Sequence, residues 1–217
     1  MSTPIVEEIE DNIVNLVSDG LKYISYSGVV VVFIGVILAM ITFMKILSPL
    51  LFIPLPGGVM MLVAGAIAAL SGVAASLYMA SKRLRPAFID LSERYAEADM
   101  GRLGSFMLYY GSISIALGLV SSITIIGAII GIPLAILGVV GVMAGLALVT
   151  ISLYNLFGRM YPEAKSPIII MGVGLAISLL MIILGFALLA AGAYLAHTRL
   201  QEVSVEVRGS PKKVIYL

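Results

Sequence analysis

Long apolar runs, interrupted by short stretches rich in proline, glycine or charge, dominate the chain. Residues 23–80 form one such run, which as a single helix would be about 87 Å long against a hydrocarbon core about 30 Å thick. The run must therefore turn back once. Prolines and glycines between Pro49 and Gly58 are the residues that end helices, so we expect transmembrane helices at 23–48 and 58–81.

The second half of the chain has the same kind of pattern. Residues 104–154 are apolar and divide at Gly127, Gly131 and Pro133, which predicts two helices joined by a tight connection. Residues 167–197 contain no comparable interruption and are expected to form one long helix. The fold class predicted is an all-α membrane protein with five transmembrane helices.

Two other segments place apolar residues on one face of a helix and charges elsewhere, which is typical of helices that lie at a membrane interface. The first is the N-terminal region, 1–22, and the second is the polar insert 81–103. Their apolar stripes are Val6, Ile9, Ile13, Leu16 and Val17, and Leu84, Phe88, Leu91 and Tyr95. A transmembrane domain over 23–197 would then carry both interfacial helices.

In the tail, residues 198–217, the spacing of apolar residues changes from the helical period to alternation. Val203, Val205 and Val207 alternate with polar residues and precede a Gly-Ser-Pro turn and a second short apolar run, which predicts a β-hairpin. An isolated hairpin is marginally stable and exposes a strand edge. We therefore expect these valines to pair with another copy or another subunit, which would make the tail an assembly element.

Composition agrees with a membrane protein, since 61% of residues are hydrophobic, 12% are charged and the mean hydropathy is +1.14. Partners are accordingly the lipid bilayer and other membrane subunits or further copies. Nucleic acid is not expected, because the net charge is only +1 and no basic stripe is present.

Positive charge predicts the orientation. With five spans, eight basic residues would lie on one side of the membrane and five on the other, and the more basic side is expected to be cytoplasmic. The first group is Lys22, Lys82, Arg83, Arg85, Arg94, Arg102, Arg159 and Lys165, and the second is Lys45, Arg199, Arg208, Lys212 and Lys213. The N-terminus would then be cytoplasmic and the tail external.

The predicted spans offer little chemistry. They contain no charged residue in their interiors, whereas ion and proton pathways usually require one. His197 is the only histidine and there is no cysteine, so Cys- and His-based metal sites are not expected. Lys45, Arg159 and His197 are interpreted as interfacial anchors. We therefore expect no enzymatic activity, no cofactor and no catalytic or metal-binding residue.

Small residues at regular spacing predict close contacts between helices, because helix association in lipid depends on packing. These residues are Ala64, Ala68, Gly72, Gly104, Gly111, Gly118, Gly141 and Gly145. Hydroxyl residues, Ser112, Ser114, Ser121, Ser122 and Thr124, give the third helix its polarity. They either bond back to their own helix or line a narrow polar path.

Two connectors carry a family resemblance. Leu153-Tyr154-Asn155-Leu156-Phe157-Gly158-Arg159-Met160-Tyr161 separates two apolar helices, and Ala87-Phe88-Ile89-Asp90-Leu91-Ser92 leads into Gly101-Arg102-Leu103-Gly104. Over about residues 84–197 the chain resembles a crenarchaeal family of multi-pass membrane proteins classed only as a domain of unknown function. The resemblance implies an archaeal cell membrane and the same architecture, and it brings no activity or site residues.

The function expected from the sequence is that of a non-enzymatic structural or assembly subunit of a membrane complex. The alternative is a transporter or channel for a small or apolar solute. A continuous polar cavity would favour the transporter, whereas a core filled by side chains would count against it.

Overall fold

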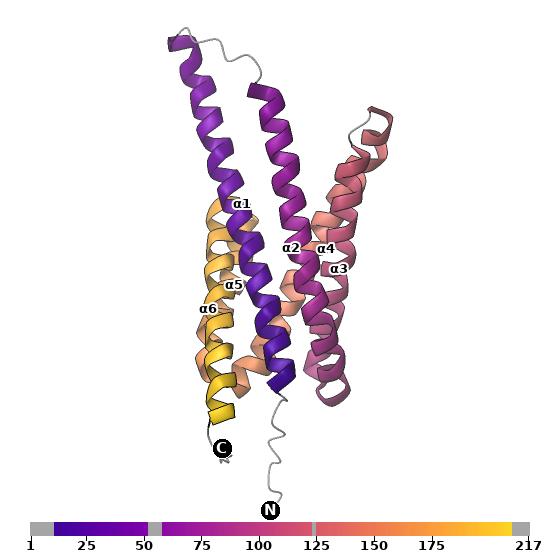
Figure 1. Cartoon of the computed structure of the whole chain (residues 1–217), viewed down its shortest axis with the longest axis vertical. Coiled ribbons are helices and arrows are strands. Elements are labelled where there is room, and N and C mark those ends of the chain that lie inside the picture. Colours follow the sequence, from indigo (N-terminus) through magenta and orange to yellow (C-terminus); the bar gives the residue numbers. More distant parts are fainter. Residues whose placement is uncertain (1–10, 52–57, 123–124, 210–217) are drawn as a thin grey trace, which may run out of the picture.

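The computed structural model describes residues 11–51, 58–122 and 125–209, and these are helical apart from short connections (Figure 1). The helices are α1 Asp11–Leu51, α2 Gly58–Arg94, α3 Asp99–Ser121, α4 Ile125–Met160, α5 Pro162–Ser178 and α6 Ile182–Gly209, with a short 3-10 helix, η1 Ala96–Ala98, between α2 and α3. The all-helical membrane class is thus confirmed for the described residues.

In the described residues, four helical stretches are long and apolar enough to cross a membrane, and there is no fifth. They are Asn12–Met40, Ala96–Ser121, Gly127–Met160 and Ile182–Val203. These segments belong to α1, α3, α4 and α6, so the predicted count of five is not supported.

The helices form three antiparallel hairpins, α1 with α2, α3 with α4 and α5 with α6 (Figure 1). Each helix packs against the next in chain order, and α6 returns to pack against α1, so the six form a closed ring. Where α1 and α3 end and α2 and α4 begin, the helices lie toward one end of the molecule, the tip end, and the α5–α6 turn lies on the same side but does not reach as far. The connections between hairpins lie at the other end, where the described chain also begins and ends.

The single long helix expected over 167–197 is wrong, because the chain reverses at Leu179–Met181 between α5 and α6. The amides of Leu180 and Met181 both donate to the carbonyl of Ile177, which satisfies backbone groups that a turn in hydrocarbon would otherwise leave unpaired. The turn itself is apolar and its leucines are exposed, Leu179 to 77% and Leu180 to 89%.

The two predicted interfacial helices are parts of longer helices in the bundle. Residues 11–22 are the first turns of α1, and 81–94 are the last turns of α2, which continues through Pro86. The predicted stripe residues Leu84, Phe88 and Leu91 are fully buried. Their apolar faces therefore pack on protein, and α3 starts directly after η1. Residues 1–10, including Val6 and Ile9, lie outside the described residues.

The predicted β-hairpin is also wrong over 201–209, because α6 continues to Gly209. Val203, Val205 and Val207 are therefore helical, and the proposed second strand falls in 210–217, outside the described residues. The alternation of valine with polar residues extends over only a few positions. Continuation of a helix already fixed by packing overrides so short a strand pattern.

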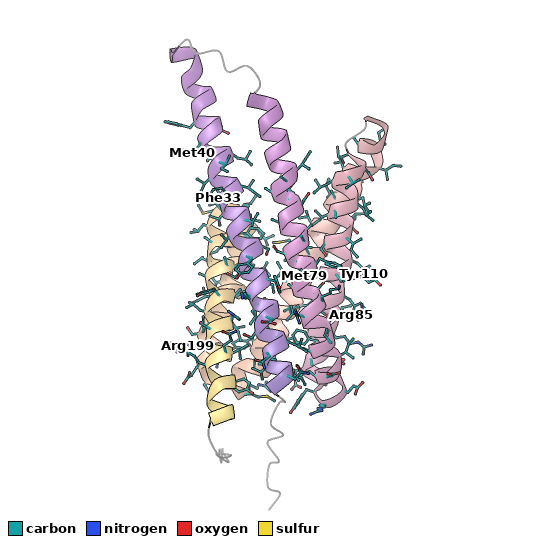
Figure 2. All side chains as sticks on the ribbon, viewed as in Figure 1. Phe33, Met40, Met79, Arg85, Tyr110 and Arg199 are labelled. Atoms are coloured by element: carbon teal, nitrogen blue, oxygen red, sulfur yellow. The ribbon has the colours of Figure 1, made fainter. Side chains whose placement is uncertain are left out.

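Basic residues gather at the end opposite the tips, which we call the basic end. Ser18 of α1 bonds to His197 of α6, so Arg199 and the last turns of α6 lie beside the start of α1. Figure 2 shows Arg85 and Arg199 toward this end and Met40 toward the tips. Because the chain reverses at 179–181, Arg199 and Arg208 lie at the same end of the molecule as Lys22. Lys45 lies in the tip half of α1.

Glycine pairs hold α3 against α4. A Cβ added to Gly104 would lie 2.7 Å from the carbonyl oxygen of Gly145, and the reverse addition gives the same distance. The pair Gly111 and Gly138 and the pair Gly118 and Gly131 are related in the same way, at 2.6 to 2.8 Å. Both helices repeat glycine every seven residues, and their backbones touch because no side chain separates them.

The packed core lies in the basic half. Buried side chains of α1 fall between Ile13 and Ser27, those of α2 between Val73 and Leu91, and those of α6 between Leu189 and Leu200. Nearer the tips, α1 is exposed from Val36 to Met40. The α1–α2 hairpin and the α3–α4 hairpin diverge there (Figure 1).

A labelling experiment checks the α5–α6 hairpin. The native chain has no cysteine, so Asp99→Cys and Glu202→Cys introduce single thiols at exposed positions. We expect a membrane-impermeant maleimide to modify both from the same side of sealed vesicles. Modification from opposite sides would instead support the single long helix and contradict the reversal at 179–181.

Candidate functional site

A cluster of cationic and aromatic side chains joins α2 to α3 near the basic end. The guanidinium carbon of Arg85 lies 4.2 Å from the ring centroid of Phe106 and 5.7 Å from that of Tyr109. The ring centroids of Tyr78 and Tyr109 are 5.3 Å apart, and the Lys82 ammonium lies 5.4 Å from the Tyr78 ring. Cations over aromatic faces are attracted by the ring quadrupole, so these contacts orient Arg85 and Lys82.

Helical spacing explains the cluster. Tyr78, Lys82 and Arg85 lie on one face of α2, and Arg102, Phe106 and Tyr109 lie on one face of α3. Because the helices are antiparallel, the Tyr78–Tyr109 and Arg85–Phe106 contacts bring Arg102 to the same end of the seam as Arg85. Within the described part of the chain no carboxylate forms an ion pair with Lys82, Arg85 or Arg102.

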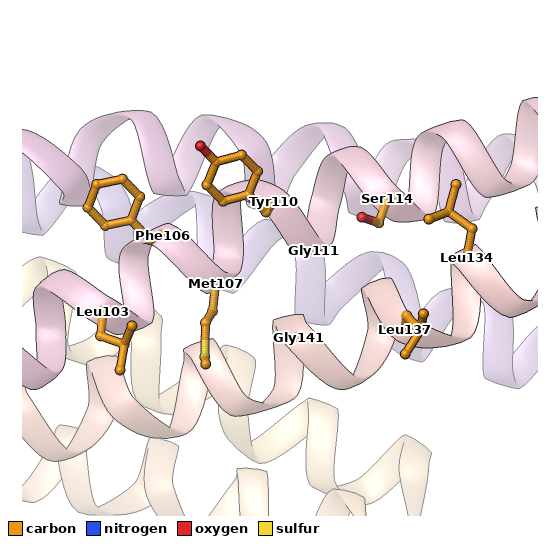
Figure 3. Close-up of a pocket in the computed structure, with 9 residues that line it drawn as sticks. All are labelled: Leu103, Phe106, Met107, Tyr110, Gly111, Ser114, Leu134, Leu137 and Gly141. Atoms are coloured by element: carbon orange, nitrogen blue, oxygen red, sulfur yellow. The ribbon is translucent and has the colours of Figure 1, made fainter.

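A groove of about 400 Å³ begins beside this cluster and runs along the α3–α4 seam toward the tips (Figure 3). Phe106 and Tyr110 stand at its basic end, and Leu134 and Leu137 of α4 line the part nearer the tips. Part of the groove is open because Gly141 carries no side chain, and a Cβ added there would meet its nearest atom only at 3.6 Å. Phe106 belongs both to the groove and to the cationic cluster.

A second groove, of about 440 Å³, follows the seam between α4 and α5. Its lining is almost wholly apolar and ends at Leu179 in the α5–α6 turn. Thr150 contributes a hydroxyl to the lining, but this hydroxyl donates to the carbonyl of Leu146. The second groove could therefore accommodate an apolar ligand, but its lining contains no charged group that would orient one.

Ser18 and His197 form the one buried polar contact between helices α1 and α6 among the described residues. The Ser18 hydroxyl donates to the His197 carbonyl oxygen at 3.1 Å. The imidazole Nδ1 lies 2.7 Å from Ser18 Oγ and 2.9 Å from the Ser18 carbonyl oxygen. With Nδ1 protonated, both hydrogens find acceptors on the opposite helix, so the pair fastens the two helices.

This pair does not have the arrangement of a nucleophile and its base. His197 is only 5% exposed and Ser18 only 1%, so neither faces a cleft from which a substrate could approach. No carboxylate hydrogen bond to the imidazole is present in the described part, and a base in such a pair is normally oriented by a third group. His197 is buried between helices, whereas the predicted interfacial anchor would be exposed.

The hydroxyls of the third predicted span make bonds within their own helix. Ser112 donates to the Tyr109 carbonyl at 2.9 Å, and Ser122 donates to the Gly118 carbonyl at 2.6 Å. Ser114 lines the α3–α4 groove, and Thr124 lies outside the described residues. In the described ranges, no three metal-ligating side chains come together.

Only some of the predicted packing residues lie in close contacts between helices. Gly104, Gly111, Gly118 and Gly145 lie in the tight α3–α4 contacts, whereas a Cβ on Gly141 would meet its nearest atom at 3.6 Å and a Cβ on Gly72 at 4.0 Å. Ala68 is exposed, and the side chain of Ala64 is outside the described part.

Sequence reasoning missed Gly131 and Gly138, which pair with Gly118 and Gly111 of α3, and it missed the cationic cluster and the Ser18–His197 contact. A spacing of seven from Gly131 through Gly138 to Gly145 was available as a signal. The spacing of Tyr78, Lys82 and Arg85 was a similar signal for the cationic cluster. Ser18 and His197 are 179 residues apart, and no local pattern connects them.

No family model, no curated protein and no solved structure matches this chain. The resemblance to a crenarchaeal membrane family therefore stays a prediction. What the chain can do is argued below from its own residues.

Proposed function

We propose that the protein is a non-enzymatic assembly subunit of a membrane complex, which presents the tip half of its helices to other membrane helices. The observation that carries this proposal is the bare segment of α1. Residues Val36 to Met40 are all exposed, and five consecutive residues cover more than one helical turn. The described residues therefore leave α1 exposed around its whole circumference to a large extent at this level.

The reach of α1 beyond the α5–α6 hairpin also supports the proposal. Gly35 packs on Ile183, near the start of α6, and α1 continues to Leu51. These 16 residues extend about 24 Å past the α5–α6 hairpin. In α2, toward the same end, Ile67, Ala68 and Leu70 are exposed as well. Association of helices in lipid depends on packing, and this hairpin offers unpacked surface for it.

The transporter alternative has less support. The core at the basic end is filled by large side chains such as Phe88 and Phe157, which are fully buried. The described hydroxyls Ser112 and Ser122 bond to their own helix. Both observations argue against a continuous polar path through the basic half, which a polar solute would need.

We also propose that the basic end faces the cytoplasm, since cytoplasmic loops carry an excess of lysine and arginine. From residue 103 to residue 158 and from residue 166 to residue 198 the chain has no Asp, Glu, Lys or Arg. The charge asymmetry between the two ends is therefore larger than the eight against five expected from five spans. The described ends of the chain would both be cytoplasmic.

Photocrosslinking in native membranes tests the assembly role. We expect Met40→Cys, carrying a thiol-reactive photocrosslinker on bare α1, to form covalent adducts with another protein or with a second copy. Leu195→Cys is the matched control, because Leu195 is 42% exposed but lies in the packed half of α6. Protein adducts should be several-fold more abundant at Met40.

Equal yields at the two positions, or adducts with lipid alone at Met40, would contradict the proposal. The absence of native cysteine removes background labelling from the chain itself. Mass spectrometry of the adduct then identifies the partner.

A further inference from the structure

We propose that the α2–α3 cationic cluster and the α3–α4 groove together bind one anionic membrane lipid, with its phosphate at Arg85 and Arg102 and one acyl chain in the groove. This inference is independent of the assembly role. It combines a charged group and an apolar groove that share Phe106.

The cations suit a phosphate. Guanidinium groups bind phosphate oxygens through charge-assisted hydrogen bonds, and stacking on Phe106 at 4.2 Å restricts the orientation of Arg85. Arg102 precedes Phe106 by one helical turn on α3 and is exposed. In the described part of the chain neither arginine is neutralised by an ion pair with a carboxylate, so both keep their charge for an external anion.

The groove suits one acyl chain. Its lining on α3 runs from Leu103 to Ser114, which corresponds to about 16 Å along the helix axis. One leaflet of the hydrocarbon core is about 15 Å deep. The groove therefore extends from the level of the cations to about the middle of the membrane, which is the depth that a single chain occupies.

The side chains at the basic end of the groove fit the region between phosphate and chain. Tyr110 is 60% exposed and its ring stacks with that of Phe106 at 6.5 Å between centroids. Tyrosine prefers the interface, where its ring meets hydrocarbon and its hydroxyl meets polar groups. Gly141, which has no side chain, leaves part of the space that the chain would fill (Figure 3).

Lipid titration followed by native mass spectrometry of the full chain in mild detergent tests the site. The probes are phosphatidylglycerol and phosphatidylcholine with identical acyl chains, and glycerol phosphate as the soluble anion. We expect phosphatidylglycerol to bind at least about 10-fold more tightly than phosphatidylcholine. Glycerol phosphate alone should compete weakly, because it lacks the chain.

The variants separate the two parts of the site. The double variant Arg85→Gln, Arg102→Gln should lose the preference for phosphatidylglycerol, with a fall of at least about 10-fold in the affinity for that lipid, because both cations are removed. Gly141→Leu should weaken both lipids alike by filling the groove, since a Cβ there has its nearest atom at 3.6 Å. Lys165→Gln is the matched control, because Lys165 lies over Tyr154 at 5.6 Å on another side of the bundle.

Any of four results would overturn the proposal. One is equal affinity for the two lipids, and another is a preference that survives in the double arginine variant while its unfolding midpoint is unchanged. The third is full competition by glycerol phosphate, which would indicate a free-anion site without the groove. A second copy or a foreign peptide retained in place of lipid would also overturn it.

Discussion

Replacing Gly138 with alanine is expected to lower the free energy of unfolding by about 2 to 3 kcal/mol, because the new methyl group has no room. A Cβ at this position would lie 2.7 Å from both the Gly111 carbonyl oxygen and the Ile115 amide nitrogen. Both atoms belong to the backbone of α3, so relief requires the helices to separate. Unfolding in mixed detergent micelles, followed by circular dichroism, measures the change.

Gly141→Ala is the matched control for Gly138→Ala. Gly141 lies one turn further along the same helix, and its added Cβ would meet Gly111 Cα at 3.6 Å, an ordinary contact. Alanine raises intrinsic helix propensity by about 1 kcal/mol relative to glycine at both positions, so this contribution cancels in the comparison. We expect Gly141→Ala to be neutral or slightly stabilising. Equal losses for the two variants would mean that backbone contact does not limit the α3–α4 approach.

The sequence identifies the class of fold because hydrophobicity over about 20 residues is a strong physical signal. It also identifies the stripe from Gly104 to Gly118, since helix packing in lipid favours small residues. What it does not identify is the partner of each stripe. The spacing of seven marks Gly131 and Gly138 as packing candidates, but their pairing with Gly118 and Gly111 of α3 is visible only when both helices are present.

The missed reversal at Leu179–Met181 has a physical explanation. Turns in water usually contain Gly, Pro, Asn or Asp, whereas this turn is built from leucine and methionine with hydrocarbon-compatible side chains. Length was the available signal, because a helix over 167–197 would be about 46 Å long, well beyond a hydrocarbon core of about 30 Å. Gly174 and Gly185, which pack against the opposing helix of the hairpin, were a second signal.

The two amphipathic stripes illustrate another limit. An apolar face at helical spacing must be covered, but periodicity does not distinguish lipid from protein as the cover. Leu84 of α2 is covered by α1, as its contact with the Gly20 position indicates, and Phe88 is covered by α3 at Gly101. Both contacts depend on a glycine of another helix, so the cover becomes apparent only in the assembled bundle.

Replacing His197 with alanine is expected to reduce the free energy of unfolding by about 2 to 3 kcal/mol, through loss of a buried ring and of its bond to α1. The imidazole is 5% exposed, and its Nδ1 is within hydrogen-bonding distance of Ser18 Oγ and of the Ser18 carbonyl. The alanine variant leaves a cavity between α1 and α6. The same micelle unfolding experiment measures the loss.

Comparing alanine variants of two serines on α1 separates the effect of the interhelical bond from the general effect of removing a buried hydroxyl. Ser18 and Ser27 are both 1% exposed, but the Ser27 hydroxyl donates at 2.7 Å to Ile24 of its own helix. We expect Ser18→Ala to cost about 1 kcal/mol, the usual size of such bonds in membranes, and Ser27→Ala to be nearly neutral. Ser18→Ala should also cost less in the His197→Ala background, because the imidazole is then absent. Equal costs for the two serines, or strict additivity of Ser18→Ala and His197→Ala, would show that the pair does not fasten α1 to α6.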